Sequence, residues 1–299
     1  MEHLISVALR DASVAFIHDE EIRPVLRRID LEIGSGQLVA LLGRNGSGKS
    51  TLLRVFAGLL PLSRGSIERV EDSPIPIVFQ NPDAQIVGET VLEDICFGLE
   101  NIAIPTEQMA ERASKALAAV GLAGFEDRPI ISLSGGQKQL VCIASAIAMN
   151  PPVIIMDEPT AMLDPISKRQ VMAIAEQLQR EGKTVIWATH SMDEVGLADR
   201  VIVLASGSLV FDGSPEQFFY GVDDLIDEAE DVGELGPEAV ATAARKSSDA
   251  RLTSPCRRLG FHPPYAVEAV QSLHARGMML DRQPVRVEDC LEAVDQLCR

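Results

Sequence analysis

The sequence has no uninterrupted apolar run of about 18 residues, the length that a membrane-crossing helix requires. Its opening, Met1–Ser6, lacks a basic stretch followed by an apolar core, so we expect no secretory signal. Basic residues are scarce, with 27 Lys and Arg against 44 Asp and Glu and a net charge of −17. Neutralising phosphates requires clustered basic side chains, so we expect neither a nucleic-acid surface nor an anionic-lipid surface. The lack of a long apolar run leads us to expect no direct membrane insertion.

Cysteines are few and show no metal-binding spacing. No pair forms a C-x-x-C motif and their number is odd, which is typical of reduced thiols in a cytosolic protein. Hydrophobic residues make up 46% of the 299 residues, enough for one large α/β domain and an appendage. The five cysteines are Cys96, Cys142, Cys256, Cys290 and Cys298.

A glycine-rich segment follows the apolar run Leu38–Leu42 and opens a helix-like run at Lys49–Ala57. Glycines permit turns that bring backbone N–H groups close to an anion, and the helix N-terminus adds to such a site. Lys49 should reach the β- and γ-phosphates, and the Ser50 hydroxyl should ligate Mg²⁺. The segment therefore predicts that the chain binds a nucleoside triphosphate. Its residues are Gly43, Arg44, Asn45, Gly46, Ser47, Gly48, Lys49, Ser50 and Thr51.

Two carboxylates end a second apolar strand signal. Val153–Met156 is followed directly by Asp157 and Glu158. A carboxylate at the end of such a strand can hold Mg²⁺, which is the role we expect for Asp157. Glu158 lies one residue further on, where it can polarise an attacking water.

A third segment, Leu133–Gln137, predicts the exposed start of a helix. Ser134 and Gln137 have capping-box spacing, and apolar residues continue at helical intervals from Leu140 to Ala148. Such an N-terminus carries a partial positive charge and a serine hydroxyl at its tip, a combination that suits a phosphate.

The order of these motifs resembles that of ABC transporter ATP-binding subunits, over roughly residues 4–220. The resemblance makes the third segment the signature motif, which reaches across a head-to-tail dimer to the second subunit's ATP. It implies that Gln80 contacts Mg²⁺ and water, that Asp164 is the D-loop aspartate and that His190 contacts the γ-phosphate. Phe16 lies where the family has an aromatic residue that stacks on adenine. The signature residues that would contact nucleotide are Ser134, Gly135, Gly136 and Gln137.

A narrower resemblance is carried by Val78–Gln85, Thr90–Ile95, Phe97–Asn101 and Thr160–Pro165. These segments are similar to the ATPases of energy-coupling factor transporters, which power bacterial and archaeal uptake of vitamins and of cobalt or nickel ions. The resemblance implies a second ATPase subunit, a transmembrane coupling subunit and a substrate-binding membrane subunit as partners. It also implies a place at the cytoplasmic face of the cell membrane. The transported substrate and the choice between homodimer and heterodimer stay open.

The implied fold is α/β, with a P-loop NTPase core of the ABC ATPase type and an N-terminal β-subdomain. We expect an ABC ATPase domain over residues 1–220, with a helical signature subdomain at about 81–150. An acidic linker or insertion at 221–252 precedes a small C-terminal helical appendage at 253–299. The linker is rich in carboxylates and has the composition of a solvated segment.

Two features concern surfaces. Leu140 stands where family members carry Arg or another long polar side chain, which could alter contacts along the signature helix. The Gln80–Asn101 region is expected to form a groove for a helix of the transmembrane subunit. Its expected apolar residues are Ile86, Val87 and Phe97, and its expected acidic rim is Glu89, Glu93 and Asp94.

Other classes fit less well. A soluble chromosome- or repair-type ABC ATPase would need a long heptad coiled coil or a cysteine-rich zinc insertion before Asp157, and neither is present. A translation-associated ABC protein would carry two such domains, which this length excludes. The ATPase subunit of a different ABC importer or exporter remains the main alternative.

Overall fold

The computed structural model describes residues 5–18, 21–69, 74–221, 254–276, 280 and 283–297. The expected linker at 221–252 lies outside these residues except for Gly221. Two compact units make up the chain, and each is described by itself. The first contains residues 1–14, 30–38 and 50–188, and the second contains 15–29, 39–49 and 189–299. None of the helices in the described ranges has the length and apolarity that crossing a membrane requires.

A parallel sheet lies in the first unit, with strands β5 (Ile77–Val78), β6 (Val153–Asp157) and β7 (Thr184–Ala188) side by side. Nearly every residue of these strands is buried, as expected for short apolar runs in a parallel sheet. Helices α1 (Lys49–Phe56) and α5 (Pro165–Arg180) supply the helical half of the α/β alternation. The strand predicted at Val153–Met156 is present as β6, which ends one residue later at Asp157.

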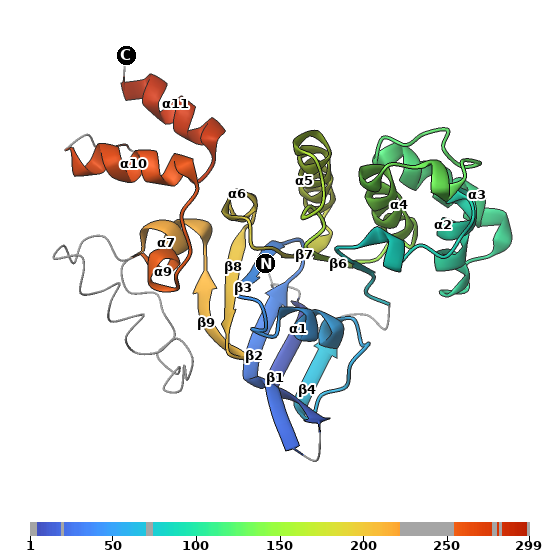
Figure 1. The fold of residues 1–299 in the computed structure, drawn as a ribbon, viewed down its shortest axis with the longest axis horizontal. Helices are drawn as coiled ribbons and strands as arrows, with labels where there is room; N and C mark the ends of the chain where they lie inside the picture. The colour runs from blue at the N-terminus through green and yellow to red at the C-terminus, as the bar shows by residue number, and fades with distance from the viewer. Residues whose placement is uncertain are drawn as a thin grey trace. The chain divides into compact units, whose positions relative to one another are not determined.

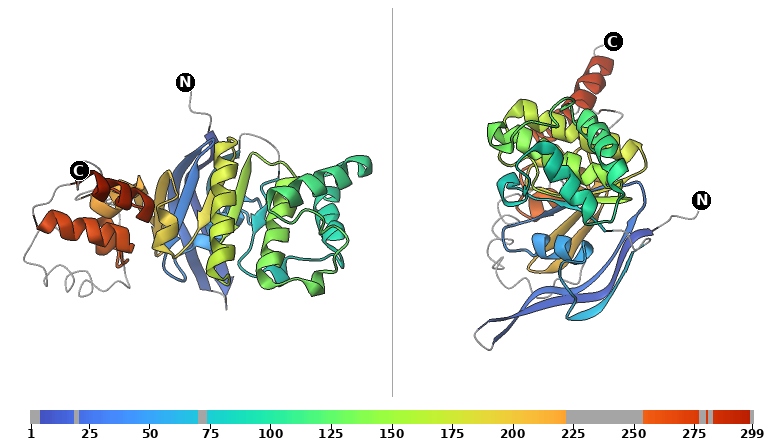
Figure 2. Two further views of the ribbon diagram at one scale, coloured as in Figure 1. Left: turned by 90° about the horizontal axis from the view of Figure 1, so that it is seen from above. Right: turned by 90° about the vertical axis from the view of Figure 1, so that its right-hand side faces the viewer.

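A three-stranded sheet has the order β2-β1-β4. Its strands are β1 (Ile5–His18), β2 (Glu21–Gly34) and β4 (Arg64–Arg69), and β1 pairs with β4 in antiparallel register. The right-hand view of Figure 2 shows β1 and β2 as a long curved ribbon. The expected N-terminal strands are therefore present.

Helices α2 (Val91–Glu100), α3 (Thr106–Ala119) and α4 (Gly135–Ala148) pack together in the first unit, as Figures 1 and 2 show. Two short 3-10 turns, η1 (Pro82–Ala84) and η2 (Ile130–Ser132), lie between the strands and helices of this region. The capping box predicted at the start of α4 is present, and α2 also begins with a capping box, formed by Thr90 and Glu93. Leu140 is only 4% exposed, so it packs among the helices.

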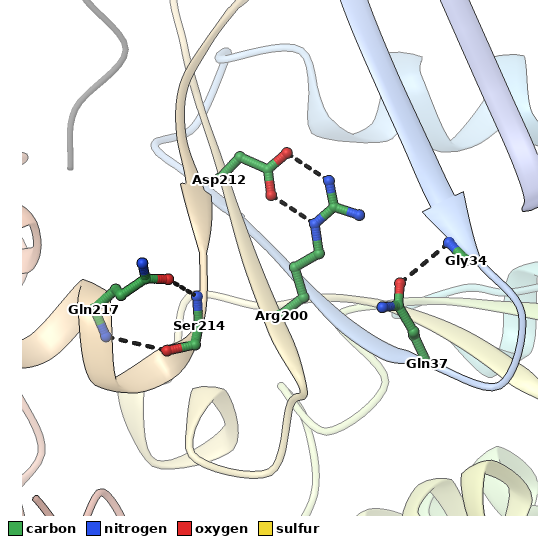
Figure 3. A network of polar contacts seen from close by, with 6 residues as sticks. All are labelled: Gly34, Gln37, Arg200, Asp212, Ser214 and Gln217. Atoms are coloured by element: carbon green, nitrogen blue, oxygen red, sulfur yellow. Dashed lines mark hydrogen bonds and ion pairs between the residues drawn. The ribbon is translucent and has the colours of Figure 1, made fainter. Parts of the chain in front are cut away.

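Among the strands of the second unit, β3 (Leu38–Gly43) pairs with β8 (Arg200–Ala205) in parallel, and β8 pairs with β9 (Ser208–Gly213) antiparallel. Figure 3 shows the Arg200 guanidinium bound to the Asp212 carboxylate through two contacts of 2.5 Å. Helix α6 (Met192–Val195) precedes β8, and α7 (Pro215–Tyr220) follows β9. Ser214 and Gln217 form the capping box of α7, which Figure 3 also shows.

The described part of the tail forms helices α9 (Pro255–Arg258), α10 (Tyr265–Ala275) and α11 (Val287–Leu297). Aromatic packing joins it to α7, because the rings of Phe218 and Phe261 lie 6.0 Å apart. The Gln271 side chain also donates to the Phe219 carbonyl at 3.1 Å. The tail is thus attached to α7 by both apolar and polar contacts.

Candidate nucleotide-binding site

The Gly43–Thr51 loop has the backbone that a phosphate cradle needs. Gly43, Gly46 and Gly48 have φ angles of 154°, 79° and 104°, a region that favours glycine. A Cβ on Gly43 would lie 2.6 Å from the Leu204 carbonyl oxygen. A Cβ on Gly46 would meet no atom within 4 Å, so the loop is open at that point. A side chain at Gly43 would therefore clash within the turn, whereas the space beside Gly46 is free.

Lys49 points back over the loop that precedes it. Its Nζ donates hydrogen bonds to the carbonyls of Gly43 at 2.8 Å and Arg44 at 3.4 Å, and the residue is 7% exposed. The Ser47 hydroxyl is buried and has no hydrogen-bond partner among the described residues. A buried hydroxyl without a partner costs free energy unless a ligand supplies one. The loop thus holds a cation and an unsatisfied hydroxyl, which fit a polyphosphate.

His190 follows β7 and lies in the same unit as the loop. The backbone N–H of Thr189 donates to the Leu41 carbonyl of β3 at 3.2 Å, which ties this turn to the strand that leads into the cradle. The Thr189 hydroxyl in turn donates to the buried Glu194 carboxylate at 2.5 Å. The second unit therefore brings an exposed His190 to the strand of the phosphate loop.

The carboxyl ends of β5 and β6 in the first unit are followed by three expected site residues, Gln80, Asp157 and Glu158. Val78 of β5 pairs with Met156 of β6, so Gln80 and Glu158 each lie two residues beyond a paired position. Ligands of open α/β sheets bind at the carboxyl ends of the strands, where these side chains are. Glu158 has a φ of 50°, an unusual value for a non-glycine residue and one found in functional turns.

The signature segment forms an exposed helix N-terminus. The Ser134 hydroxyl accepts the Gln137 N–H at 3.2 Å, and the Gln137 side chain accepts the Ser134 N–H at 3.0 Å. Ser134 and Gly135 are exposed, and a Cβ on Gly135 would meet nothing within 4 Å. The start of α4 is therefore open to a ligand or to a second chain.

Asp164 caps α5. Its carboxylate accepts the N–H groups of Ile166 at 2.9 Å and Ser167 at 3.1 Å, and the Ser167 hydroxyl at 2.6 Å. The hydroxyl contact, with the two N–H groups, holds the pKa of the Asp164 carboxyl below its usual value. This aspartate is therefore fixed in place before any partner arrives.

Three other expected residues are exposed or nearly so. Phe16 is 44% exposed on β1, Ser50 is exposed in the first turn of α1 and Thr51 beside it is partly exposed. Their orientation toward a nucleotide stays a prediction.

The expectation that Asp94 lies on an acidic rim is wrong. Asp94 is 7% exposed, and its carboxylate accepts the N–H groups of Val87 at 2.8 Å and Gly88 at 3.3 Å. Glu93 is exposed, but its carboxylate accepts the backbone N–H of Thr90 in the capping box and also that of Glu89. Sequence spacing on a helix does not reveal that the preceding loop folds back onto one of its carboxylates. The third expected rim residue, Glu89, is exposed.

A pocket of about 230 Å³ borders the phosphate loop in the second unit. Part of its wall comes from the tail, at Leu259 and Phe261, and a Cβ on Gly260 would lie 3.7 Å from the Arg44 guanidinium. The remaining lining residues are Arg44–Ser47 and Val203–Ser206. No sequence signal pointed to this contact, because it depends on the folding of a tail far away in the chain.

Comparisons with known proteins agree with this geometry. The ABC transporter family profile matches residues 26–161. The energy-coupling factor transporter ATP-binding protein EcfA1 of Caldanaerobacter subterraneus is 45% identical over 234 residues, covering 73% of this chain and 84% of that protein. The protein of the same name in Symbiobacterium thermophilum is 37% identical over 289 residues, 92% of this chain and 90% of that one.

Solved structures give the same result. The structure of cbiO1 from Clostridium perfringens, described as part of the ABC transporter complex cbiONQ, has a TM-score of 0.64 and 31% identity. It covers 82% of this chain and 96% of that chain. A dimeric ATP-binding cassette in a post-hydrolysis state, bound to ADP and Pi, has a TM-score of 0.63 and 30% identity over 70% of this chain and 98% of that one.

The fold and its motifs define an ATPase of the ABC type, which confirms the predicted fold class. The chain belongs to the family of energy-coupling factor transporter ATP-binding proteins. The narrower of the two resemblances is thereby confirmed as well.

Proposed function

We propose that this chain hydrolyses ATP with the residues described above and thereby powers uptake of a micronutrient, either a vitamin or a transition-metal ion. Its family consists of the ATPase subunits of energy-coupling factor importers. The residue assignment rests mainly on the Gly43–Thr51 loop. In this loop the Lys49 ammonium lies over the Gly43 carbonyl, and the buried Ser47 hydroxyl has no hydrogen-bond partner among the described residues.

In the proposed mechanism, Lys49 and the loop N–H groups hold the β- and γ-phosphates. The Ser50 hydroxyl, Asp157 and Gln80 would hold Mg²⁺, and the ion would neutralise charge on the phosphates. Glu158 orients the attacking water and accepts its proton. His190 donates a hydrogen bond toward the γ-phosphate. Phe16 stacks on the adenine.

We further propose that two such chains, or this chain and a related ATPase, pair head to tail. Ser134–Gln137 of each chain then contacts the ATP held by the other, and Asp164 lies at the shared face. The exposed N-terminus of α4 supports this arrangement, since its capping box leaves Ser134 and Gly135 accessible. A partial positive charge there favours the γ-phosphate of a neighbouring nucleotide.

These assignments divide the chain into domains. Residues 1–220 form the ATPase domain, and its helical subdomain, at about 81–150, contains the signature motif. Residues 253–299 form the appendage. A transmembrane coupling subunit and a substrate-binding membrane subunit complete the transporter. They hold this chain at the cytoplasmic face of the cell membrane.

The test is a pair of variants with different expected defects. Glu158→Gln should bind ATP and form a closed dimer, but should hydrolyse at least ~100-fold more slowly, because it lacks the general base. Lys49→Ala should lose ATP affinity instead. Nucleotide binding, sedimentation with ATP and phosphate release distinguish the two. Wild-type hydrolysis by Glu158→Gln would refute the assignment of Glu158.

A further inference from the structure

Gly136, the second glycine of the signature segment, packs against a side chain from another helix. A Cβ on Gly136 would lie 2.7 Å from the Ser167 Oγ and 3.2 Å from its Cβ. Real Cβ atoms do not approach other heavy atoms to 2.7 Å, so one of the two residues would have to move. Ser167 lies in the first turn of α5, and Gly136 in the first turn of α4.

The backbone at Gly136 does not itself demand glycine. Gly136 lies within α4 and is absent from the residues with positive φ. Alanine is favoured over glycine in helices by about 1 kcal/mol, so an alanine here would stabilise an isolated helix. The contact with Ser167 therefore supplies a steric reason for the glycine.

Ser167 is also fixed from its other side. Its hydroxyl donates to the Asp164 carboxylate at 2.6 Å, and its N–H donates to the same carboxylate at 3.1 Å. Rotating the hydroxyl away from Gly136 would break the shorter bond. Asp164, Ser167 and Gly136 thus form a continuous chain of contacts from the D-loop to the signature motif.

We propose that Ser167 is a positioning residue that sets the spacing between the Asp164 turn and the start of α4. This rests on the proposed function, in which both segments face the nucleotide of the second subunit. An error of ~1 Å in the position of a contacting group can cost on the order of 10²-fold in rate. Ser167, held by Asp164, would keep the Asp164 turn and the start of α4 at a fixed spacing.

The experiment combines Gly136→Ala with Ser167→Gly. Gly136→Ala should lower kcat at least about tenfold, with the ATP affinity of the separate chain unchanged, because the cradle is untouched. Adding Ser167→Gly removes both clashing atoms and the positioning hydroxyl together, so the double variant should have the kcat of Ser167→Gly alone. If the double variant is slower than Ser167→Gly, the glycine is needed for the partner's nucleotide and the proposal is overturned.

Ser167→Ala tests the same link from the other side, without a clash. It should lower kcat and weaken ATP-dependent dimerisation in the Glu158→Gln background, while KM and the melting temperature change little. Ser114→Ala is the matched control, because it also removes a serine–carboxylate hydrogen bond, to Glu126 at 3.0 Å on an exposed surface. Its kcat should equal that of the wild type.

Equal kcat values for Ser167→Ala and wild type would also overturn the proposal. Failure of the proposed function is distinguishable from this result. It would appear as wild-type hydrolysis by Glu158→Gln, whereas failure of the positioning role would appear only in the Gly136 and Ser167 variants.

Discussion

The side-chain amide of Gln139 donates a hydrogen bond to the backbone carbonyl of Phe79 at 3.1 Å. Phe79 directly precedes Gln80, and its own N–H donates to the Gln85 side chain at 3.0 Å. Both polar groups of this residue are thus bound by side chains. Lys138, next to Gln139 on α4, adds an ion pair with Asp83 at 2.6 Å. The signature helix and the Gln80 loop are therefore joined within the first unit.

Replacing Gln139 with Met should separate activity from stability. Gln139 is 1% exposed and its Oε1 has no partner among the described residues, so Met loses one hydrogen bond but also removes an unsatisfied oxygen. The two effects have opposite signs, and we expect the free energy of unfolding to change by less than ~1 kcal/mol. The ATPase rate should fall several-fold, because the peptide before Gln80 is no longer held.

The control for this variant is Gln177→Met, which changes an exposed glutamine on α5 that bonds to Glu181. It should leave both unfolding and hydrolysis unchanged. Denaturant titration and a phosphate-release assay give the two measurements. Equal ATPase rates for Gln139→Met and wild type would show that the Phe79 contact does not position Gln80.

Local features of this fold could be predicted from the sequence because few residues encode each of them. A serine and a glutamine three residues apart defined the start of α4, and the apolar run Val153–Met156 defined β6 except for its last residue. Contacts set by distant parts of the chain could not be predicted. The burial of Asp94, the contact between Ser167 and Gly136 and the Phe261 wall beside the phosphate loop all depend on how separate segments pack.

Mixing two inactive variants tests the composite site. Lys49→Ala destroys the cradle of its own chain, and Ser134→Arg blocks the site that its chain contributes to the partner. In a head-to-tail heterodimer of the two, one site keeps both its wild-type Lys49 and its wild-type Ser134. If the chain forms homodimers, random pairing should restore roughly a quarter of the wild-type ATPase rate. A mixture that stays inactive would indicate that Lys49 and Ser134 of the same chain act together.

Asp94→Ala should destabilise the first unit. The substitution removes the two hydrogen bonds that the buried Asp94 carboxylate accepts from the Val87 and Gly88 N–H groups, and a hydrogen bond to a charged group contributes roughly 1.5–3 kcal/mol. We expect the free energy of unfolding to fall by about 2 kcal/mol or more. Glu89→Ala, on the exposed part of the same loop, should change it by less than ~0.5 kcal/mol. Urea denaturation of the two variants measures the difference.

The buried thiols should make the fold sensitive to alkali. Burial raises the pKa of Cys142 to about 12 and that of Cys256 to about 12, above the ordinary value of 9.0. Unfolding exposes both thiols and lowers their pKa values, so the unfolded chain loses these protons first as the pH rises. Their contribution to stability is complete below pH 9 and is lost progressively toward pH 12.

Two measurements check this. The free energy of unfolding should decline as the pH rises above 9, and this decline should be shallower in Cys142→Ala. At pH 8, an alkylating reagent should modify Cys142 and Cys256 much more slowly in the folded chain than in urea, because only the thiolate reacts. Mass spectrometry measures the extent of modification. Rapid modification of either cysteine in the folded chain would contradict its burial.

The surface beside the Gln80 loop should bind a helix of the transmembrane subunit. Val87 and Phe97 are 65% and 46% exposed, and the exposed Glu89 lies two residues from Val87. An amphipathic helix with an Arg on its edge would cover the two apolar side chains and pair with Glu89. The carboxylates of Glu93 and Asp94 accept hydrogen bonds from backbone N–H groups, so reversing their charge would disturb folding and would not test docking.

The sharper variant is therefore Val87→Asp combined with Glu89→Lys. It should lose co-purification with the transmembrane subunit, while the separate chain keeps its ATPase rate and its melting temperature. Leu59→Asp combined with Glu107→Lys makes similar chemical changes at exposed residues outside the Gln80–Asn101 region, and the complex should survive them. A complex that survives the Val87 and Glu89 changes as well would mean that the coupling surface lies elsewhere on the chain.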